Sequence, residues 1–551
     1  MDKMDKRGGK PMKKTMFFAL ALIFSCAAAL CASEKKSLLI MFDGLRGDVL
    51  QSAATPNLDT IRDGSWADGY RGAWTYQAHT NLDSDPSSAT NHVAIITGVT
   101  ATKNGCFNNG QTKDAKWGEY PPYLARLKKA DPSLVTVWLY NWGEDADIPT
   151  NADFFAAPRG GFDGDMGVID DAVAFLNGTF PDVTDYKGNE WKAGTDPDAI
   201  ALYLDSMDIY GHGEGFSVFV PEYRQKMAKY DERVGDLLSA IRSRPNFANE
   251  DWQIVVVSDH GGYKTGHGIP TCENCYTIPL FVSSKTVSAG RMVGQPQNCD
   301  VAAYIMEHLT GAIPPEFDGK IEKTVIDSAP DIESGLLAYF PFDGDLNDAA
   351  GKITATAGAK TPSLSDLGFS GQGAILRDGA SLSFGALPEL NAANAPGLSC
   401  AFWFRTPQVQ SGDPPLISNK NWESGQNPGF ALLANYNGPS GNTLYLNIGD
   451  GANRDDIGGL DYYPDSRWRF VAFTAEYGGN AVLYLGDDAG NLAFVSDSIA
   501  DLGSLETGLN WFLGQDGTGA YSKTLNNVKI DELRLWSRPL STDEIRAVYG
   551  K

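Results

Sequence analysis

Short apolar runs alternate with helical stretches from Ser37 to about Met306, and this alternation constrains the fold more than any other feature of the chain. A helix between two strands lets them pair in parallel, which gives a sheet with helices on its faces. The clearest strands are predicted at residues 38–42, 135–139, 200–204 and 253–257. We therefore predict an α/β domain with a mostly parallel sheet, whose functional groups lie beyond the carboxyl ends of the strands.

The pattern changes after Gly335 to alternating apolar strands that are cut by Gly, Asn and Asp. Such short strands between turn residues predict an all-β jelly-roll sandwich. The clearest of them are at residues 398–404, 443–446, 469–474 and 481–485. Ser541 and Glu544 form a capping-box pattern that predicts a short terminal helix.

A chain of 551 residues is too long for one hydrophobic core, so at least two domains are expected. We place a signal peptide at 1–33, the α/β domain at 34–312, a linker at 313–334 and the sandwich at 335–551. The linker contains two consecutive prolines and several acids. We expect few contacts to cross this boundary, so that the first domain works without the second.

The N-terminus carries Lys10, Lys13 and Lys14, followed by an apolar run at 16–30 and then small residues. This order is typical of a secretory signal peptide, and the run is shorter than the ~20 residues that a membrane span needs. We place cleavage between Cys31 and Glu34 and expect a secreted or periplasmic protein without a membrane span. Lipid attachment at Cys26 or Cys31 is the weaker alternative, because bulky residues lie just before each.

Five cysteines remain after such cleavage: Cys106, Cys272, Cys275, Cys299 and Cys400. In an oxidising compartment they predict one or two disulfides and at least one free thiol. The Cys272 and Cys275 spacing lacks the second ligand pair of a zinc ribbon, so a structural disulfide or packing is favoured for it.

The formal net charge of -24 argues against a nucleic-acid backbone or an anionic membrane surface as the main partner. Any site for an anion must therefore be local. One candidate is the segment from Pro86 to Gly98, where Ser87 and Ser88 precede an apolar helical stretch. The free backbone NH groups at a helix start suit a phosphoryl oxygen, although an ordinary Ser/Thr N-cap has the same pattern.

Aspartate and histidine residues follow three of the predicted strands. Asp43 follows the first strand, Asp208 and His212 follow the third, and Asp259 and His260 follow the fourth, with His267 shortly after. The chain has only six histidines, and three of them fall in these segments together with aspartates. Imidazole and carboxylate groups are ligands of zinc, so we predict that these residues form a metal site.

These four segments, in this order, resemble the alkaline phosphatase superfamily, and most closely its type I phosphodiesterase/nucleotide pyrophosphatase branch, over residues 36–310. The branch motif Thr-Phe-Pro-Asn-His corresponds to Ser88-Ala-Thr-Asn-His92, so the resemblance implies Ser88 as the nucleophile and Asn91 on the phosphate. Thr90 replaces the proline of the motif. The resemblance also implies two Zn²⁺ ions, one held by Asp43, Asp259, His260 and the Ser88 oxygen, the other by Asp208, His212 and His267.

The resemblance implies a hydrolase of phosphate esters, most simply a phosphodiesterase that acts through a phosphoseryl intermediate, and the signal-peptide pattern predicts that it is exported. A sulfatase-like ester hydrolase is the alternative with the same sheet. Sulfatases hold one calcium through hard oxygen ligands, whereas His212, His260 and His267 suit zinc. The leaving group stays open at this point.

Three stretches of the second domain resemble laminin-G-like, concanavalin-like jelly rolls: residues 335–348, 467–474 and 529–540. Such domains often bind glycans or proteins, and often Ca²⁺, for which Asp343 and Asp531 are candidate ligands. A structural role in turns explains both residues equally well. A glycan-binding or adhesion protein with a vestigial catalytic half is the remaining alternative, and the intact set of ligand positions argues against it.

Overall fold

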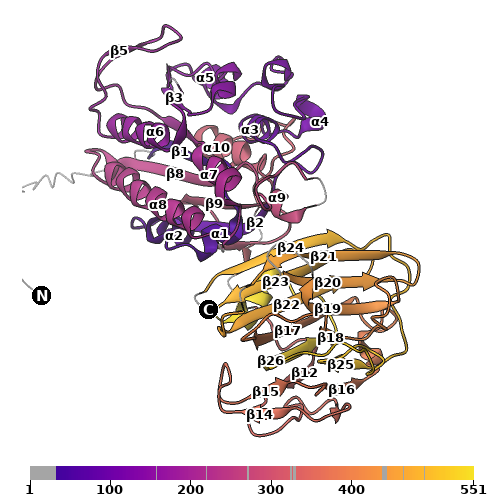
Figure 1. The fold of residues 1–551 in the computed structure, drawn as a ribbon. Helices are drawn as coiled ribbons and strands as arrows, with labels where there is room; N and C mark the ends of the chain where they lie inside the picture. Colours follow the sequence, from indigo (N-terminus) through magenta and orange to yellow (C-terminus); the bar gives the residue numbers. More distant parts are fainter. Residues whose placement is uncertain are drawn as a thin grey trace, which may run out of the picture.

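The computed structural model describes residues 33–550 apart from 157, 219, 270–271, 323–324, 327–329, 437–442, 463 and 489. Two domains lie next to each other, an α/β domain in indigo to magenta and a β domain in orange to yellow (Figure 1). The predicted signal peptide lies outside the described residues, apart from Ser33. Among the helices that the structure describes, none combines the length and the apolar character of a membrane span.

The first domain is built on one mixed sheet with the strand order β11-β10-β2-β9-β8-β1-β7-β3-β4. The four predicted strands are all present, and they are neighbours in the order β8-β1-β7-β3 and pair in parallel. β9 pairs antiparallel with both β8 and β2. The prediction of a mostly parallel sheet is therefore confirmed for its centre. The strands of this domain are β1 (Glu34–Phe42), β2 (Arg71–His79), β3 (Thr136–Leu139), β4 (Phe154–Phe155), β5 (Val183–Thr184), β6 (Glu190–Trp191), β7 (Ala199–Leu204), β8 (Glu250–Ser258), β9 (Thr277–Ser284), β10 (Gly290–Met292) and β11 (Val325–Ile326).

Helices cover both faces of this sheet (Figure 1). Successive side chains of a strand point to opposite faces of the sheet. Leu38 and Ile40 of β1 therefore join a core that is covered by α2, α6 and α8. Leu39 and Met41 join a second core under α3, α5 and α10. A strand that is buried on both faces explains the continuous apolar runs of the sequence. The helices are α1 (Gly47–Ser52), α2 (Pro56–Asp63), α3 (Ser88–Thr97), α4 (Ala101–Asn104), α5 (Tyr123–Ala130), α6 (Gly161–Leu176), α7 (Ser206–Glu214), α8 (Pro221–Arg242), α9 (Glu273–Tyr276) and α10 (Asp300–Thr310), with 3-10 turns η1 (Thr112–Asp114), η2 (Gly143–Asp147) and η3 (Phe247–Asn249).

The second domain is a sandwich of two antiparallel sheets, as predicted. One sheet has the order β14-β15-β26-β17-β22-β23-β24, with β12 also paired to β26, and the other has the order β13-β16-β25-β18-β19-β20-β21. The predicted capping box is present, since Ser541 Oγ accepts a hydrogen bond from Glu544 N at the start of α11. The elements are β12 (Leu336–Phe340), β13 (Thr356–Ala357), β14 (Ser363–Ser365), β15 (Gly373–Leu376), β16 (Leu382–Gly385), η4 (Pro388–Leu390), β17 (Gly397–Arg405), β18 (Pro415–Ser418), β19 (Gly429–Tyr436), β20 (Thr443–Gly449), β21 (Arg454–Asp461), β22 (Arg469–Glu476), β23 (Asn480–Asp487), β24 (Leu492–Ser498), β25 (Trp511–Leu513), β26 (Val528–Trp536) and α11 (Thr542–Tyr549).

The two domains contact each other directly, contrary to the expectation of a boundary that few contacts cross. Strand β24 of the sandwich packs against α1 and α9 of the α/β domain. Arg291 pairs with Asp543 at 2.6 Å, and the Tyr263 hydroxyl donates to Gly458 O at 2.9 Å. The residues of this interface are far from the linker in sequence, so the composition of the linker did not indicate the interface.

All five cysteines of the described chain are free and buried, so the predicted disulfides are absent from the structure. Cys400 lies inside the sandwich in β17, whereas Cys106 packs beside α3. Cys299 immediately precedes α10. These three thiols are inside separate parts of the fold, where no partner can reach them without backbone movement.

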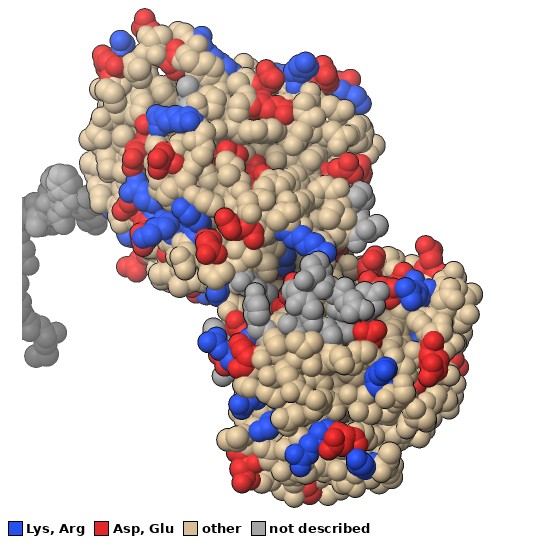
Figure 2. Space-filling view, viewed as in Figure 1, with Lys and Arg blue, Asp and Glu red and all other residues tan. Residues whose placement is uncertain are grey.

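Charged groups of both signs are interspersed on the face shown in Figure 2. Asp43, Asp259 and His260 are buried and do not contribute to this surface pattern.

Candidate metal centre and nucleophile

The predicted site residues come together at the carboxyl ends of the central strands. Asp43 follows β1 directly and Asp259 follows β8, and Asp208 is in the first turn of α7, just after β7. Asp43 N donates to Leu204 O at 2.9 Å and Asp259 N donates to Phe42 O at 3.2 Å. These bonds continue the parallel ladder by one residue and so hold the two carboxylates side by side.

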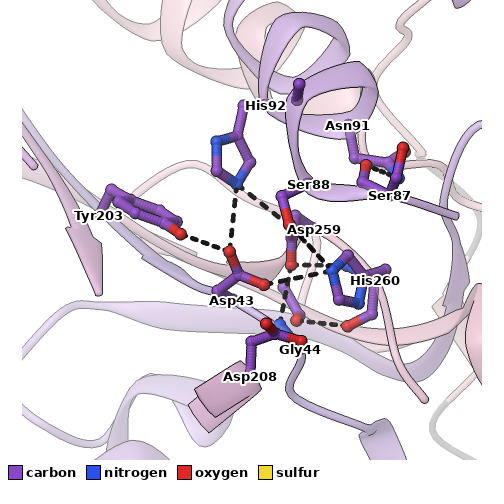
Figure 3. A network of polar contacts seen from close by, with 12 residues as sticks. Asp43, Gly44, Ser87, Ser88, Asn91, His92, Tyr203, Asp208, Asp259 and His260 are labelled. Atoms are coloured by element: carbon purple, nitrogen blue, oxygen red, sulfur yellow. Dashed lines mark hydrogen bonds and ion pairs between the residues drawn. The ribbon is translucent and has the colours of Figure 1, made fainter. Parts of the chain in front are cut away.

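Asp43, Asp259 and His260 form one buried cluster that could hold a metal ion. His260 Nε2 lies 3.2 Å from Asp43 Oδ1 and 3.4 Å from Asp259 Oδ2 (Figure 3). The other Asp259 oxygen accepts hydrogen bonds from Gly44 N at 2.9 Å and His260 N at 2.7 Å. These amides fix the carboxylate, so that one oxygen remains directed at the cluster.

Asp208, His212 and His267 form a second cluster of the same kind. His212 Nε2 is 3.4 Å from Asp208 Oδ2, and His267 Nε2 is 3.7 Å from Asp208 Oδ1. The rings of His260 and His267 stack with centroids 3.9 Å apart, which places the two clusters next to each other. The structure therefore groups all six non-serine ligands that the resemblance implied in the predicted two sets.

The ring orientation of the three histidines fits metal ligation. In each ring Nδ1 faces a backbone carbonyl: Gly261 O at 2.7 Å from His260, Thr265 O at 2.8 Å from His212 and Pro86 O at 2.7 Å from His267. A carbonyl can only accept, so Nδ1 donates its proton there, and Nε2 is the nitrogen that is left to coordinate a metal ion. This outer contact is the one that zinc-binding histidines make.

Two buried carboxylate oxygens of the clusters, Asp43 Oδ1 and Asp208 Oδ1, accept no hydrogen bond in the part of the chain described, and they face the Nε2 atoms of His260 and His267 at 3.2 and 3.7 Å. A buried carboxylate oxygen without a hydrogen bond is costly unless a cation neutralises it. Burial and the neighbouring Asp43 carboxylate raise the pKa of Asp208 above its usual range. The donor set of carboxylate oxygens and Nε2 lone pairs fits divalent metal ions, and its imidazoles favour zinc over calcium.

Ser88 is the first residue of α3, as predicted from the hydroxylic residues before an apolar stretch. Its Oγ lies 3.2 Å from His260 Nε2, beside the first metal cluster (Figure 3). The preceding residue Ser87 is the N-cap by backbone geometry, and its side chain makes no capping bond. The helix start therefore leaves backbone NH groups near the Ser88 hydroxyl.

The side chain of Asn91 is bonded within the fold. Its Oδ1 accepts from Asn81 N at 3.1 Å and from Asn298 Nδ2 at 2.8 Å, and its Nδ2 donates to Ser87 O at 2.9 Å. The predicted role of Asn91 on the phosphate stays a prediction, which these contacts do not favour. The Asn109 side chain lies at the start of α3, where its Oδ1 accepts a hydrogen bond from Ala89 N at 2.9 Å.

His92 is a buried part of the site that sequence reasoning named only within the nucleophile motif. Its Nδ1 lies 2.9 Å from Asp145 Oδ1 and its Nε2 lies 3.1 Å from Asp259 Oδ2. Burial lowers the pKa of His92, but the carboxylates of Asp145 and Asp259 outweigh this effect and raise the pKa well above its usual value. Since both ring nitrogens face acceptors, His92 is an imidazolium that orients Asp259 and is not a metal ligand. The Tyr203 hydroxyl donates to Asp43 Oδ2 and orients that carboxylate similarly.

The two calcium candidates of the sandwich hold the same loop. Asp531 Oδ2 accepts from Phe369 N at 2.7 Å and Ser370 N at 2.9 Å, and Asp343 Oδ1 accepts from Gln372 N at 2.7 Å. Neither belongs to the metal-like clusters found within the described residues. These contacts are those of structural turn residues, and calcium binding by the pair stays a prediction.

Comparisons with known proteins agree with this geometry. Residues 37–274 match the family model described as type I phosphodiesterase / nucleotide pyrophosphatase, and residues 379–546 match that of the concanavalin A-like lectin/glucanases superfamily. Both resemblances predicted from the motifs are thereby confirmed. Every residue of the two clusters lies within the first match.

Individual relatives cover the first domain. Human ectonucleotide pyrophosphatase/phosphodiesterase family member 7 is 24% identical over 245 residues, which are 42% of this chain and 48% of that protein. The bovine bis(5'-adenosyl)-triphosphatase ENPP4 is 24% identical over 274 residues, 45% of this chain and 53% of that protein. The chain thus spans about half the length of these relatives. The solved structure of murine ectonucleotide pyrophosphatase / phosphodiesterase 5 in complex with AMP covers 53% of this chain and 98% of its own, with 13% identity and a TM-score of 0.37, which is too low to carry an argument.

Proposed function

We propose that this chain, which carries a type I phosphodiesterase/nucleotide pyrophosphatase domain ahead of a concanavalin-like domain, is an exported two-zinc phosphodiesterase that acts through a phosphoseryl intermediate. One observation carries the proposal. Three histidines from two separate segments have their Nδ1 protons at backbone carbonyls, so that three Nε2 atoms meet three aspartates beside one serine hydroxyl.

In this proposal Asp43, Asp259, His260 and Ser88 Oγ hold one zinc ion, and Asp208, His212 and His267 hold the other. Bound zinc ions lower the pKa of a coordinated hydroxyl or water and offset negative charge on phosphoryl oxygens. Asp43, Asp259 and His260 directly follow strands β1 and β8, and Asp208 lies in the first turn of α7 after β7, so the fold presets the spacing of these side chains.

Ser88 Oγ is placed to attack the phosphorus atom. The Ser88 hydroxyl loses its proton to solvent, a bond forms between Ser88 Oγ and phosphorus as the bond to the leaving oxygen breaks, and the leaving alkoxide takes a proton from solvent. Water then attacks the phosphoseryl group, which releases the second product and restores the Ser88 hydroxyl. The backbone at the start of α3 and the exposed Asn109 amide lie where they can donate to phosphoryl oxygens.

The residues favour zinc phosphodiesterase chemistry over the sulfatase alternative, because three imidazoles replace the oxygen ligands that calcium prefers. Export is proposed from the charged and apolar pattern of residues 10–33. For the sandwich we propose a glycan or cell-surface ligand, by its match to the concanavalin A-like superfamily. A phosphate ester is the substrate in this proposal, and its leaving group is left open.

The test is a panel assay on the purified full chain with its zinc quantified in the same sample. We expect hydrolysis of an aryl phosphodiester, slower hydrolysis of a phosphomonoester, and about two zinc ions per chain, with activity lost to a chelator and restored by zinc but not by calcium. A single calcium with sulfate-ester hydrolysis would establish the sulfatase alternative instead. A folded protein without bound metal or hydrolytic activity would support the adhesion alternative.

A further inference from the structure

We infer that the sandwich domain is a positioning element of the metal centre, because it holds in place the loop at residues 259–268 that supplies Asp259, His260 and His267. This inference rests on the proposed two-zinc function. It concerns residues outside the ligand sets and assigns to the second domain a role in the chemistry of the first.

The loop rests with its backbone on α9. Gly261 N donates to Cys275 O at 2.9 Å and Gly262 N donates to Asn274 O at 3.0 Å. The approach is so close that a Cβ on Gly261 would lie 2.1 Å from Asn274 O. Because glycine alone permits this contact, the position of α9 directly sets the position of the loop.

The other side of the loop is held by Arg46 and by the ligand-bearing helix α7. Arg46, which is buried and paired with Asp48 at 2.7 Å, donates from Nη1 to Gly262 O at 3.1 Å. Thr265 O faces His212 Nδ1 at 2.8 Å. A shift of the loop therefore changes the support of a histidine in the second cluster as well as the place of His267.

The sandwich contacts α9, Arg46 and the loop itself. The Asn274 side chain, which is buried on α9, donates from Nδ2 to Phe494 O of β24. The Phe494 ring lies 5.9 Å from the Arg46 guanidinium carbon. Between these contacts, the Tyr263 hydroxyl of the loop donates to Gly458 O of β21 at 2.9 Å. Two strands of the second domain thus fix one face of the metal-binding loop.

The second cluster depends most on this support. His212 is 46% exposed, whereas His260 is fully buried among groups of its own domain. His267 is part of the loop itself, and its Nδ1 donates to Pro86 O. Loss of the sandwich contact should therefore weaken the Asp208, His212 and His267 site more than the other.

Gly459→Ala tests this from the sandwich side, since a Cβ on Gly459 would lie 2.3 Å from the Tyr263 hydroxyl oxygen. Gly451→Ala is the matched control, because both glycines have φ 98° while a Cβ on Gly451 has Pro428 Cγ at 3.5 Å as its nearest neighbour. Both variants carry the same backbone strain, and only one presses on the loop. The readouts are zinc content after dialysis against a weak chelator, zinc affinity by competition, and the Tm.

We expect wild type and Gly451→Ala to keep about two zinc ions, and Gly459→Ala to keep about one, with the weaker site losing affinity about 10-fold or more, as changes around metal ligands commonly do. Tyr263→Phe, which removes the hydroxyl without a clash, should weaken the same site at nearly wild-type Tm, and adding it to Gly459→Ala should recover part of the loss. Equal zinc affinity in Gly459→Ala, Tyr263→Phe and Gly451→Ala would overturn the inference. Absence of zinc from the wild type would instead refute the proposed function.

Discussion

His92→Leu removes a cation from between two buried carboxylates, and its effect can be worked out from the structure. His92 is fully buried, 2.9 Å from Asp145 Oδ1 and 3.1 Å from Asp259 Oδ2. Removing one partner of a buried ion pair leaves an uncompensated charge and costs about 3–5 kcal/mol. At about 2 °C per kcal/mol for a large domain, the Tm of the α/β domain in zinc-free protein should fall by about 6–10 °C.

Differential scanning calorimetry of zinc-free protein measures this fall in Tm, and two further variants test whether the uncompensated charge causes it. His308→Leu is the control, because His308 is also buried, but its Nε2 faces the backbone carbonyl of Asp251 at 2.9 Å and burial lowers its pKa, so the side chain that is removed is neutral. Adding Asp145→Leu to His92→Leu removes one of the stranded carboxylates and should recover about 2 kcal/mol. A fall of less than about 2 °C, or a double variant no more stable than His92→Leu, would refute the reasoning.

Two other predictions follow from contacts of single residues. Asn109→Ala should lower kcat on an aryl phosphodiester by about 10²-fold at unchanged Tm, as the loss of one oxyanion donor does. Asn91→Ala should mainly lower the Tm, because the Asn91 side chain bonds within the fold. The opposite pattern would assign the contact with phosphate to Asn91. Burial lowers the pKa of Lys420 to about 7, so from pH 7 to about 10 the unfolded chain binds a proton that the folded sandwich lacks, and stability should rise with pH in this window. Calorimetry at pH 7 and 9 should show this rise in wild type and lose it in Lys420→Met, and an equal rise in both would contradict the assignment.

The sequence predicted the core of the fold, and a cluster of aspartates and histidines at one edge of the sheet, because both depend on local patterns. Strands that are buried on both faces need continuous apolar runs, and these were visible at β1, β7 and β8. Residues that follow parallel strands lie at one edge of the sheet, which predicted a shared site for Asp43 and Asp259, whereas their assignment to one metal ion came from the resemblance.

The remaining features depend on long-range contacts that have no local pattern. Asn109 lies in an irregular loop, and only the fold brings it to the start of α3. The Asp145 partner of His92 is 53 residues away. The domain interface uses the backbone carbonyl of Gly458 in β21 and the hydroxyl of Tyr263, and neither residue is unusual in sequence.

The cysteines were misjudged for a related reason. Compartment and number suggested disulfides, but a disulfide needs two thiols within reach; Cys272 and Cys275, whose thiols contact each other, meet this condition and are free in the structure. The structure buries Cys106, Cys299 and Cys400 in separate places.

Ser88→Ala tests the central claim most directly when turnover and zinc content are measured in the same preparation. Ser88 Oγ is the proposed nucleophile, but it is only one ligand beside Asp43, Asp259 and His260. The account predicts that turnover of an aryl phosphodiester falls by about 10³-fold or more while zinc stays close to two ions per chain. Residual activity above about a tenth of wild type, with zinc bound, would contradict a phosphoseryl mechanism at Ser88.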